Sequence, residues 1–246
     1  MEKAPGAYRE IWNRKPALRE VYDDIYRRIG AVSVPGRTLE IGAGSGNFKT
    51  FAPDTISSDI LPAPWLDLVC DAQRLPFADA SFANVIMVDV LHHIGSPRRF
   101  LEEIQRVLEP NGRLIFCEPA ITPLSRLFYG LLHDEPVDMS ADPLATVTID
   151  ADKNPYDSNQ AIPTLLLGRF RDALARTVPG LAFESVDLFS FLAYPLSGGF
   201  RPWSLLPAFL ARPLLKLEWT CRRAIGSGAA FRMLAVFRRK ANRPDG

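Results

Sequence analysis

Short apolar runs alternate with amphipathic segments along the first half of the chain. Apolar residues recur at helical spacing in 16–30, which has proline at its start and glycine at its end, and again in 96–108. Short runs typical of strands occur at 38–41, 55–59, 67–70, 84–90 and 113–117. The run 84–90 is almost continuously apolar, as expected for a parallel strand buried on both faces. Strands that alternate with helices predict right-handed βαβ units and a parallel sheet.

The pattern changes in the second half of the chain. Pro110, Asn111 and Gly112 are predicted to break the chain between the helix 96–108 and the next strand. The later elements predicted are a helix at 163–178 and strands at 181–189 and 231–239. Two irregular stretches, 119–162 and 190–230, each follow a strand. We expect both to leave the carboxyl edge of the sheet, where open α/β proteins bind ligands.

The stretch TLEIGAGSGNF, residues 38–48, places three glycines in five residues directly after a strand. Glycine lacks a Cβ atom, so such a loop lets the backbone approach a ligand closely. The dinucleotide fingerprint G-x-G-x-x-G needs a glycine at the position of Asn47. Glu40 precedes the first glycine by two residues. This spacing suits a ligand that has a cationic amino-acid portion and no pyrophosphate.

At this point the chain resembles the class I S-adenosylmethionine-dependent methyltransferases, close to their small-molecule, methyltransferase type 11-like branch. The resemblance covers about 38–119 and rests on LEIGAGSGNF, Asp59, DAQRLPFADASFANVIMVDVLHHI and RRFLEEIQRVLEPNGRLIFCEP. It implies an α/β fold with a doubly wound, Rossmann-like, seven-stranded sheet, in which six strands are parallel and the last is antiparallel. Residues 1–246 would form one methyltransferase domain. The stretches 119–162 and 190–230 would be insertions that form a cap on the acceptor side.

The resemblance also implies the cofactor S-adenosylmethionine, with S-adenosylhomocysteine as the product, and a set of residues that bind it. That set is Glu40, Gly42, Ala43, Gly44, Gly46, Asn47, Asp59, Ile60, Asp71, Ala72, Asp89, Val90 and His92. Glu40 and the glycine loop would hold the methionine part, Asp59 the ribose hydroxyls and Asp71 the adenine amino group. Ile60 would pack on the adenine, and 89–92 would line the floor near the methyl group. Asp is also common after strands, so Asp59 and Asp71 have the alternative interpretation of ordinary turn residues.

Three residues are candidates for catalysis because each lies at, or just after, the carboxyl end of a strand. They are His92, Glu118 and His133. A base is needed mainly if the acceptor is a hydroxyl group, since the cofactor already activates the methyl group. His92 and His93 also suggest a metal site. Adjacent side chains in an extended segment point to opposite sides, so we expect no shared metal ion and assign none.

Composition narrows the setting in which the chain works. Of 246 residues, 47% are hydrophobic and 23% are charged, which suits a chain with a sizeable core. No apolar run is as long as the roughly 18–20 residues of a membrane span, and the first residues lack the apolar segment of a secretory signal. Cys70, Cys117 and Cys221 are scattered and form neither a disulfide framework nor a metal-ligand spacing. We therefore expect a cytoplasmic protein.

The net charge of +1 hides a basic carboxyl-terminal part. From residue 196 onward there are ten Lys and Arg residues against Glu218 and Asp245. Within this part, 201–225 interleaves apolar and basic residues, which is typical of an interfacial helix. The stretch is interpreted either as a peripheral contact with the inner face of a membrane or as a cap helix packed on its own domain. We expect the acceptor of the methyl group to be a small molecule or a lipid- or glycan-linked group.

Two other classes of function fit parts of the sequence. An NAD-dependent reductase would use a similar sheet, but the missing third-position glycine argues against it. A non-catalytic binding module could be built on the same methyltransferase fold, although the intact glycines and acids argue against this alternative. Nucleic acid is not an expected partner, because no basic and aromatic channel pattern occurs outside the carboxyl-terminal part. The sequence carries no signal for an oligomeric state.

Overall fold

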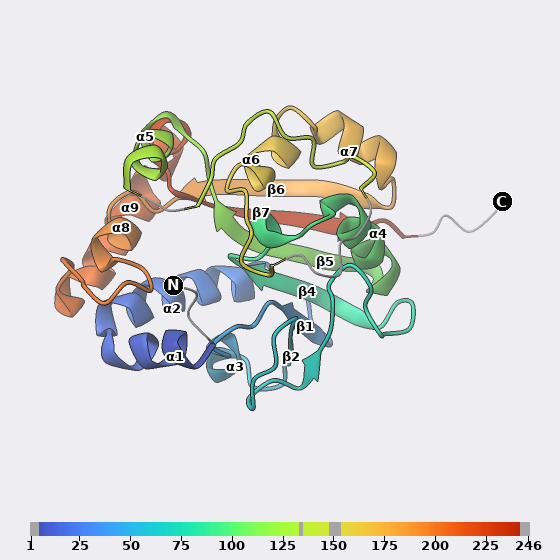
Figure 1. Cartoon of the computed structure of the whole chain (residues 1–246), viewed down its shortest axis with the longest axis horizontal. Coiled ribbons are helices and arrows are strands. Elements are labelled where there is room, and N and C mark those ends of the chain that lie inside the picture. Colours follow the sequence, from blue (N-terminus) through green and yellow to red (C-terminus); the bar gives the residue numbers. More distant parts are fainter. Residues whose placement is uncertain (1–4, 133–134, 148–153, 242–246) are drawn as a thin grey trace.

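A seven-stranded sheet forms the centre of the computed structural model, which describes residues 5–132, 135–147 and 154–241 (Figure 1). The strands are β1 (Thr38–Ile41), β2 (Ile56–Asp59), β3 (Leu68–Val69), β4 (Phe82–Val88), β5 (Leu108–Pro119), β6 (Leu181–Phe189) and β7 (Arg232–Arg239). Their order in the sheet is β3-β2-β1-β4-β5-β7-β6. Strand β7 pairs antiparallel with both β5 and β6, and the other neighbouring pairs are parallel. The predicted sheet, with six parallel strands and an antiparallel last one, is confirmed.

Helices cover both faces of the sheet. They are α1 (Pro5–Arg14), α2 (Pro16–Val32), α3 (Phe48–Phe51), α4 (Pro97–Val107), α5 (Pro123–Leu132), α6 (Ile162–Leu167), α7 (Arg171–Thr177), α8 (Ala193–Ser197) and α9 (Ala208–Ala229), with a 3-10 turn η1 (Leu91–His93). One hydrophobic cluster joins one face to α4, α6 and α7, and a second joins the other face to α2, α8 and α9. Figure 1 shows α4, α6 and α7 on the side of the sheet opposite α1 and α2.

The side chains of β4 point alternately to the two faces of the sheet, and this explains why the strand is apolar throughout. Val85 and Met87 belong to the first cluster, whereas Ile86 between them belongs to the second. Successive side chains of a strand point to opposite faces, and here each face is covered by helices. The almost continuous apolar run in the sequence is the result.

Two predicted boundaries differ from the structure. Strand β5 begins at Leu108 and runs through the predicted break, because Leu108 pairs with Phe82 before a register shift and Asn111 adopts a left-handed φ of 66°. Such a bulge accommodates extra residues without ending the strand. The helix predicted at 163–178 is two helices, α6 and α7, because Gly168 has φ −101° and ψ −106°, outside the helical region.

Helix α9 belongs to the second layer and lies against α2 and β6. It buries Ala211 and Leu215 in the second cluster. Its buried Glu218 points toward the start of α8, where Oε1 accepts hydrogen bonds from the backbone N–H groups of Leu192 (2.6 Å) and Ala193 (2.7 Å). Burial raises the pKa of Glu218, and these backbone donors oppose that rise. One carboxylate thereby joins two helices of the layer.

Glu218→Ala should destabilise the fold by about 1–3 kcal/mol, because two backbone N–H groups lose a carboxylate acceptor and the buried space of the side chain stays empty. Urea unfolding followed by circular dichroism measures this change. Glu102→Ala is the matched control, since Glu102 is half-exposed on α4 and, within the described part of the chain, forms an ion pair with Arg98. Surface substitutions of this kind change the free energy of unfolding by about 0.5 kcal/mol or less. Equal stability of the two variants would contradict the role of Glu218.

Candidate functional site

The carboxyl ends of the parallel strands bring most of the predicted site residues to one edge of the sheet. Glu40 lies in β1, Asp59 ends β2, Asp71 follows β3, Asp89 follows β4 and Glu118 lies near the end of β5. Open α/β sheets bind their ligands at this edge. The topology therefore places these residues along one edge of the sheet.

The glycine loop after β1 has a backbone that requires glycine. Gly42, Gly44 and Gly46 have φ values of 67°, 50° and 73°, all in the left-handed region. A Cβ atom on Gly42 would overlap the side chain of Val90, and one on Gly46 would lie 2.5 Å from the ring of Trp65. The loop is thus packed closely against the turn that follows β4.

Glu40 is a buried acid below this loop. Glu40 is only 6% exposed, and its Oε2 has no hydrogen-bond partner among the described residues. Burial, reinforced by the charge of Asp59 and weakened by Lys49, raises the pKa of Glu40 to about 8. A buried carboxylate without a partner is unfavourable until a cation or donor reaches it. The orphaned oxygen and the glycine backbone together fit the ammonium-bearing methionine part of S-adenosylmethionine.

Asp59 connects β2 to the glycine loop. Its Oδ2 accepts a hydrogen bond from the backbone N–H of Gly44 (2.8 Å), and its Oδ1 accepts one from Leu61 (3.0 Å). Ile60, which lies between Asp59 and Leu61 in the chain, is 50% exposed and presents an apolar side chain at this edge of the sheet. A carboxylate has about four acceptor positions, so Asp59 retains capacity for two hydroxyl donors.

Asp71 holds the turn after β3. Its Oδ1 accepts hydrogen bonds from the backbone N–H (2.8 Å) and the side-chain amide (3.1 Å) of Gln73. Gln73 in turn accepts from the backbone N–H of Ser96 (2.7 Å), at the start of α4. Ala72, beside Asp71, is buried. These bonds fit the interpretation as a turn residue, and contact with adenine stays a prediction.

Trp65 and α1 were not predicted as parts of the site. The indole N–H of Trp65 donates to the carbonyl oxygen of Gly44 (2.9 Å). The guanidinium of Arg9, on α1, lies 4.4 Å from the centre of the Trp65 ring. An aromatic ring and a helix from the amino-terminal part therefore cover the glycine loop. The sequence gives little sign of this arrangement, because the contact between Arg9 and Trp65 joins segments that are far apart in the chain.

A buried ion pair fixes the end of β4. Both carboxylate oxygens of Asp89 pair with the guanidinium of Arg232, at 2.6 and 2.7 Å, and Tyr22 donates its hydroxyl proton to Oδ2 (2.9 Å). Burial would raise the pKa of Asp89, but the charge of Arg232 outweighs it and lowers that pKa. Asp89 has a left-handed φ of 59°, which the bidentate pair holds in place. Arg232 was missed, although an arginine opening an apolar final strand is a usable signal.

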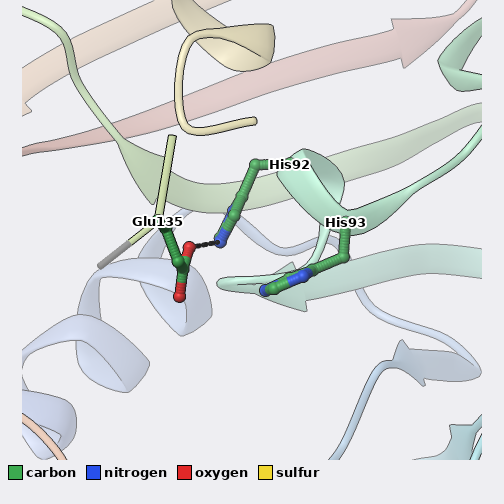
Figure 2. A group of neighbouring side chains, drawn as sticks. All are labelled: His92, His93 and Glu135. Carbon is green, nitrogen blue, oxygen red and sulfur yellow. Dashed lines mark ion pairs between the residues drawn. The ribbon is translucent and has the colours of Figure 1, made fainter. Parts of the chain in front are cut away.

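His92 lies between two carboxylates. Glu118 is fully buried, and its Oε1 accepts from the backbone N–H groups of Val90 and Leu91, each at 2.7 Å. Its Oε2 lies 2.6 Å from Nδ1 of His92. On the other side of the ring, Oε2 of Glu135 lies 3.4 Å from Nε2 (Figure 2). Burial alone would lower the pKa of His92, but Glu118 and then Glu135 outweigh it and raise the pKa to about 10.

The expected orientation of the two adjacent histidines was wrong. The segment is a 3-10 turn and not extended, so the rings of His92 and His93 lie 4.2 Å apart, tilted by 40°. Figure 2 shows both side chains on the same side as Glu135. Glu135 itself was not predicted, although an acid directly before Pro136 in an irregular stretch could have marked it. The third catalytic candidate, His133, lies outside the described residues.

Comparisons with known proteins agree with this geometry. Residues 39–116 match the model of the Methyltransferase domain family. A demethylmenaquinone methyltransferase of Paenarthrobacter aurescens (strain TC1) is 32% identical over 157 residues, which are 52% of this chain and 62% of the relative. The ubiquinone/menaquinone biosynthesis C-methyltransferase UbiE of Desulfotalea psychrophila is 38% identical over 61 residues, 25% of this chain and 24% of the relative.

A solved structure shares the fold along most of the chain. A SAM-dependent methyltransferase from Thermotoga maritima, described as a possible histamine N-methyltransferase, has a TM-score of 0.55 and 18% identity. The match covers 91% of this chain and 92% of that one. At this identity the likeness concerns the fold alone.

The fold is that of the class I S-adenosylmethionine-dependent methyltransferases. Residues 39–116 match the methyltransferase type 11 family model, in agreement with the resemblance seen in the sequence. The chain spans 62% and 24% of the lengths of the two curated relatives above, and residues 117–246 lie outside the match to the family model.

Glu40→Gln should change how stability depends on pH. The pKa of Glu40 is about 8 in the folded protein and 4.5 in the reference state, so between these values the unfolded chain loses a proton that the folded protein keeps. The free energy of unfolding therefore falls as pH rises toward 8 and is constant above it. Glu40→Gln cannot ionise, so its free energy of unfolding does not fall in this way. Between pH 4.5 and about 8, its free energy of unfolding should therefore rise relative to that of the wild type by about 1–3 kcal/mol.

Urea unfolding at several pH values, without cofactor, measures the difference. Parallel pH profiles for wild type and variant would show that Glu40 does not carry the raised pKa. The same variant should bind the cofactor more weakly, because the amide has no charge to offer an ammonium group.

Proposed function

We propose that this chain transfers a methyl group from S-adenosylmethionine to a lipid-linked acceptor with an ionisable oxygen or carbon, of which a quinol is one example. The observation that carries the methyl-transfer part is the orphaned carboxylate of Glu40 beneath a left-handed glycine loop. The quinol class is supported by the names of the relatives, which act on demethylmenaquinone and on ubiquinone or menaquinone precursors.

The residues of the sheet edge have distinct tasks in this proposal. Glu40 pairs with the ammonium of the cofactor, the backbone of 42–46 lies against its methionine part and Asp59 accepts from its ribose hydroxyls. The cofactor supplies a methyl group that its sulfonium already activates. The protein then has to align the acceptor and exclude water, and proximity of this kind supplies much of the acceleration.

The turn after β4 serves the acceptor side. Glu118 uses both oxygens within the protein, so we assign it as a positioning residue that holds the turn and orients His92. His92 is the remaining candidate for catalysis among the described residues, and its Nε2 lies 3.4 Å from Oε2 of Glu135 (Figure 2). Asp89, paired with Arg232, fixes the backbone from which this turn starts.

An exposed apolar surface along α5 and α9 supports a lipid-linked acceptor. We define the α5–α9 surface by its large exposed apolar residues, Leu124, Leu127, Trp203, Leu205, Phe209, Leu210, Leu217 and Ile225. Phe209 is 79% exposed and Leu205 is 71% exposed. Figure 1 shows α5 and α9 together at one edge of the molecule, and the two helices are in contact. Trp219 is not part of the surface, because it packs on Phe189 and Arg28.

Charge favours an anionic bilayer as the occupant of this surface. Arg126, Lys216 and Arg223 are exposed on the same two helices, and no acidic residue of either helix is exposed. Apolar side chains flanked by cations are typical of segments that lie in the interface of anionic lipids. Within the described residues, no helix is long and apolar enough to cross a membrane. The contact we propose is therefore peripheral.

Asp59→Ala should weaken S-adenosylmethionine binding roughly ten- to hundredfold, because hydrogen bonds to a charged group contribute about 1.5–3 kcal/mol. Isothermal titration calorimetry measures the affinity. Asp59→Asn separates two effects, since the amide oxygen can still accept from the Gly44 N–H. Asp54→Ala, at an exposed position before β2, is the matched control and should bind like the wild type. Unchanged affinity in Asp59→Ala would remove Asp59 from the site.

Transfer itself is tested with cofactor that carries a radiolabelled methyl group, incubated with the protein and with fractions of a bacterial lysate. We expect label in the organic-extractable fraction and its loss in Asp59→Ala. Label in the aqueous fraction alone would overturn the lipid-linked acceptor and keep methyl transfer. Cofactor binding without transfer to any fraction would favour a non-catalytic binding module, and binding of NADH in its place would favour a reductase.

Membrane contact should be visible in co-sedimentation with vesicles of phosphatidylglycerol and phosphatidylcholine. We expect binding that weakens as salt rises, since exposed charges are screened over about 8 Å at physiological ionic strength. Phe209→Asp with Leu217→Asp should abolish binding, and Lys216→Gln with Arg223→Gln should reduce it and its salt dependence. Val147→Asp is the control and should bind vesicles like the wild type. Val147 is also an exposed apolar residue (42%), but it lies beside Arg98 of α4 and is not part of the α5–α9 surface. Equal, negligible binding to anionic and neutral vesicles at low salt would exclude the membrane contact.

A further inference from the structure

We propose that His92, His93 and Glu135 form a binding site for a divalent transition metal ion of the zinc type. One ligand atom from each of these residues lies within 4.8 Å of the others. The residues come from two segments, the turn after β4 and the stretch after α5, which meet at the carboxyl edge of the sheet. Figure 2 shows the three side chains converging from these segments.

The separation of His92 from Glu135 fits a shared metal ion better than a direct hydrogen bond. Nε2 of His92 and Oε2 of Glu135 are 3.4 Å apart. Hydrogen bonds from N–H to oxygen usually span about 2.7–3.2 Å. In a tetrahedral site with metal–ligand distances of about 2.0–2.2 Å, two ligand atoms lie roughly 3.3–3.5 Å apart. The separation of these two atoms falls in that range, whereas the set of three reaches up to 4.8 Å, so the side chains would have to move closer together around an ion.

His92 also has the support that a metal-binding histidine needs. Its Nδ1 lies 2.6 Å from the carboxylate of Glu118, which can only accept, so Nδ1 keeps its proton and Nε2 is the atom that would release a proton to bind a metal. Glu118 is itself fixed by the backbone N–H groups of Val90 and Leu91. A carboxylate behind a ligating histidine is the usual arrangement around zinc, where it sets the tautomer and the ring orientation.

Glu135 is held by the segment that also holds the turn of His92. Ser158 donates its hydroxyl proton to Oε2 of Glu135 (3.1 Å), and the side-chain amide of Gln160 donates to the same oxygen. Between them, the backbone N–H of Asn159 donates to the carbonyl oxygen of His92 (2.9 Å). Both of these bonds end on Oε2, so an ion bound by this oxygen would replace one of the two donors, and the other would still orient the carboxylate. Three consecutive residues therefore fix the two sides of the proposed site relative to each other.

Two imidazoles and one carboxylate select the kind of metal and leave a position for the acceptor. Imidazole suits zinc and its neighbours in the first transition row, whereas magnesium and calcium prefer oxygen ligands. Three protein ligands with an open fourth position are typical of catalytic zinc sites. An acceptor oxygen in that position would lose its proton more readily. This role rests on the proposed function, whereas the binding of the metal does not.

Calorimetric titration of the chelator-treated full chain with Zn²⁺, without cofactor, tests the site. We expect one ion per chain and at least tenfold weaker binding in His93→Ala and in Glu135→Gln. Glu118→Gln should bind tenfold to hundredfold more weakly, because it removes the charge behind His92 while its amide oxygen can still accept from the backbone of the turn. Cys221→Ser and Glu102→Gln are controls outside the site and should bind like the wild type. Circular dichroism confirms that each variant folds.

Co²⁺ gives a second readout that does not depend on comparing affinities, because its tetrahedral complexes absorb strongly in visible light. We expect that absorption in the wild type and its loss in Glu135→Gln. Absence of Zn²⁺ binding, or equal affinity in the wild type, His93→Ala and Glu135→Gln, would overturn the proposal. Cofactor affinity measured in the metal-free chain is independent of these results, so failure of the metal site and failure of the methyltransferase function are distinguishable.

Discussion

The carboxylate of Glu118 holds the turn on which both halves of the site depend. One of its oxygens accepts two backbone N–H groups of the turn, and the other binds the ring of His92. The turn carries Val90 against Gly42 on one side and presents the histidines on the other. Because a buried carboxylate is costly without donors, this geometry is strongly favoured once Glu118 is inside the protein. A single buried side chain thereby relates the glycine loop to the turn that carries the two histidines.

Three buried glutamates in this protein have contrasting surroundings. Glu118 and Glu218 each accept two backbone N–H groups, so burial is compensated by hydrogen bonds and fixes neighbouring elements. Oε2 has no hydrogen-bond partner in Glu40 or in Glu218 among the described residues, and burial raises the pKa of both, but Glu218 keeps two backbone donors on Oε1 whereas the pKa of Glu40 rises to about 8. Buried acids with donors organise a fold, whereas a buried acid without them stores unfavourable free energy that a ligand can release. The contrast separates the structural carboxylates from the one suited to binding.

The sequence was informative where the relevant interactions are local. The glycine spacing and the acids at strand ends follow from short stretches, and parallel topology alone brings Glu40, Asp59 and Asp71 to one edge. The missed features join distant segments. Arg232 reaches Asp89 across 143 positions, and Trp65 is covered by a helix that precedes it. His92 and His93 were misjudged because a 3-10 turn and an extended segment place adjacent side chains differently.

The position of β7 has a consequence for the order in which the protein can assemble. Strand β7 is the last in sequence, yet it lies between β5 and β6, so β6 has no neighbour in the sheet until β7 inserts. Arg232, its first residue, also neutralises Asp89. Early in folding the chain therefore carries an unpaired strand and a carboxylate that lacks its counter-ion. Pairings of such high sequence separation form slowly, because much chain entropy is lost before they contribute. The glycine loop is local and can form early, but the turn that completes the site reaches its final geometry only when the closing strand is in place.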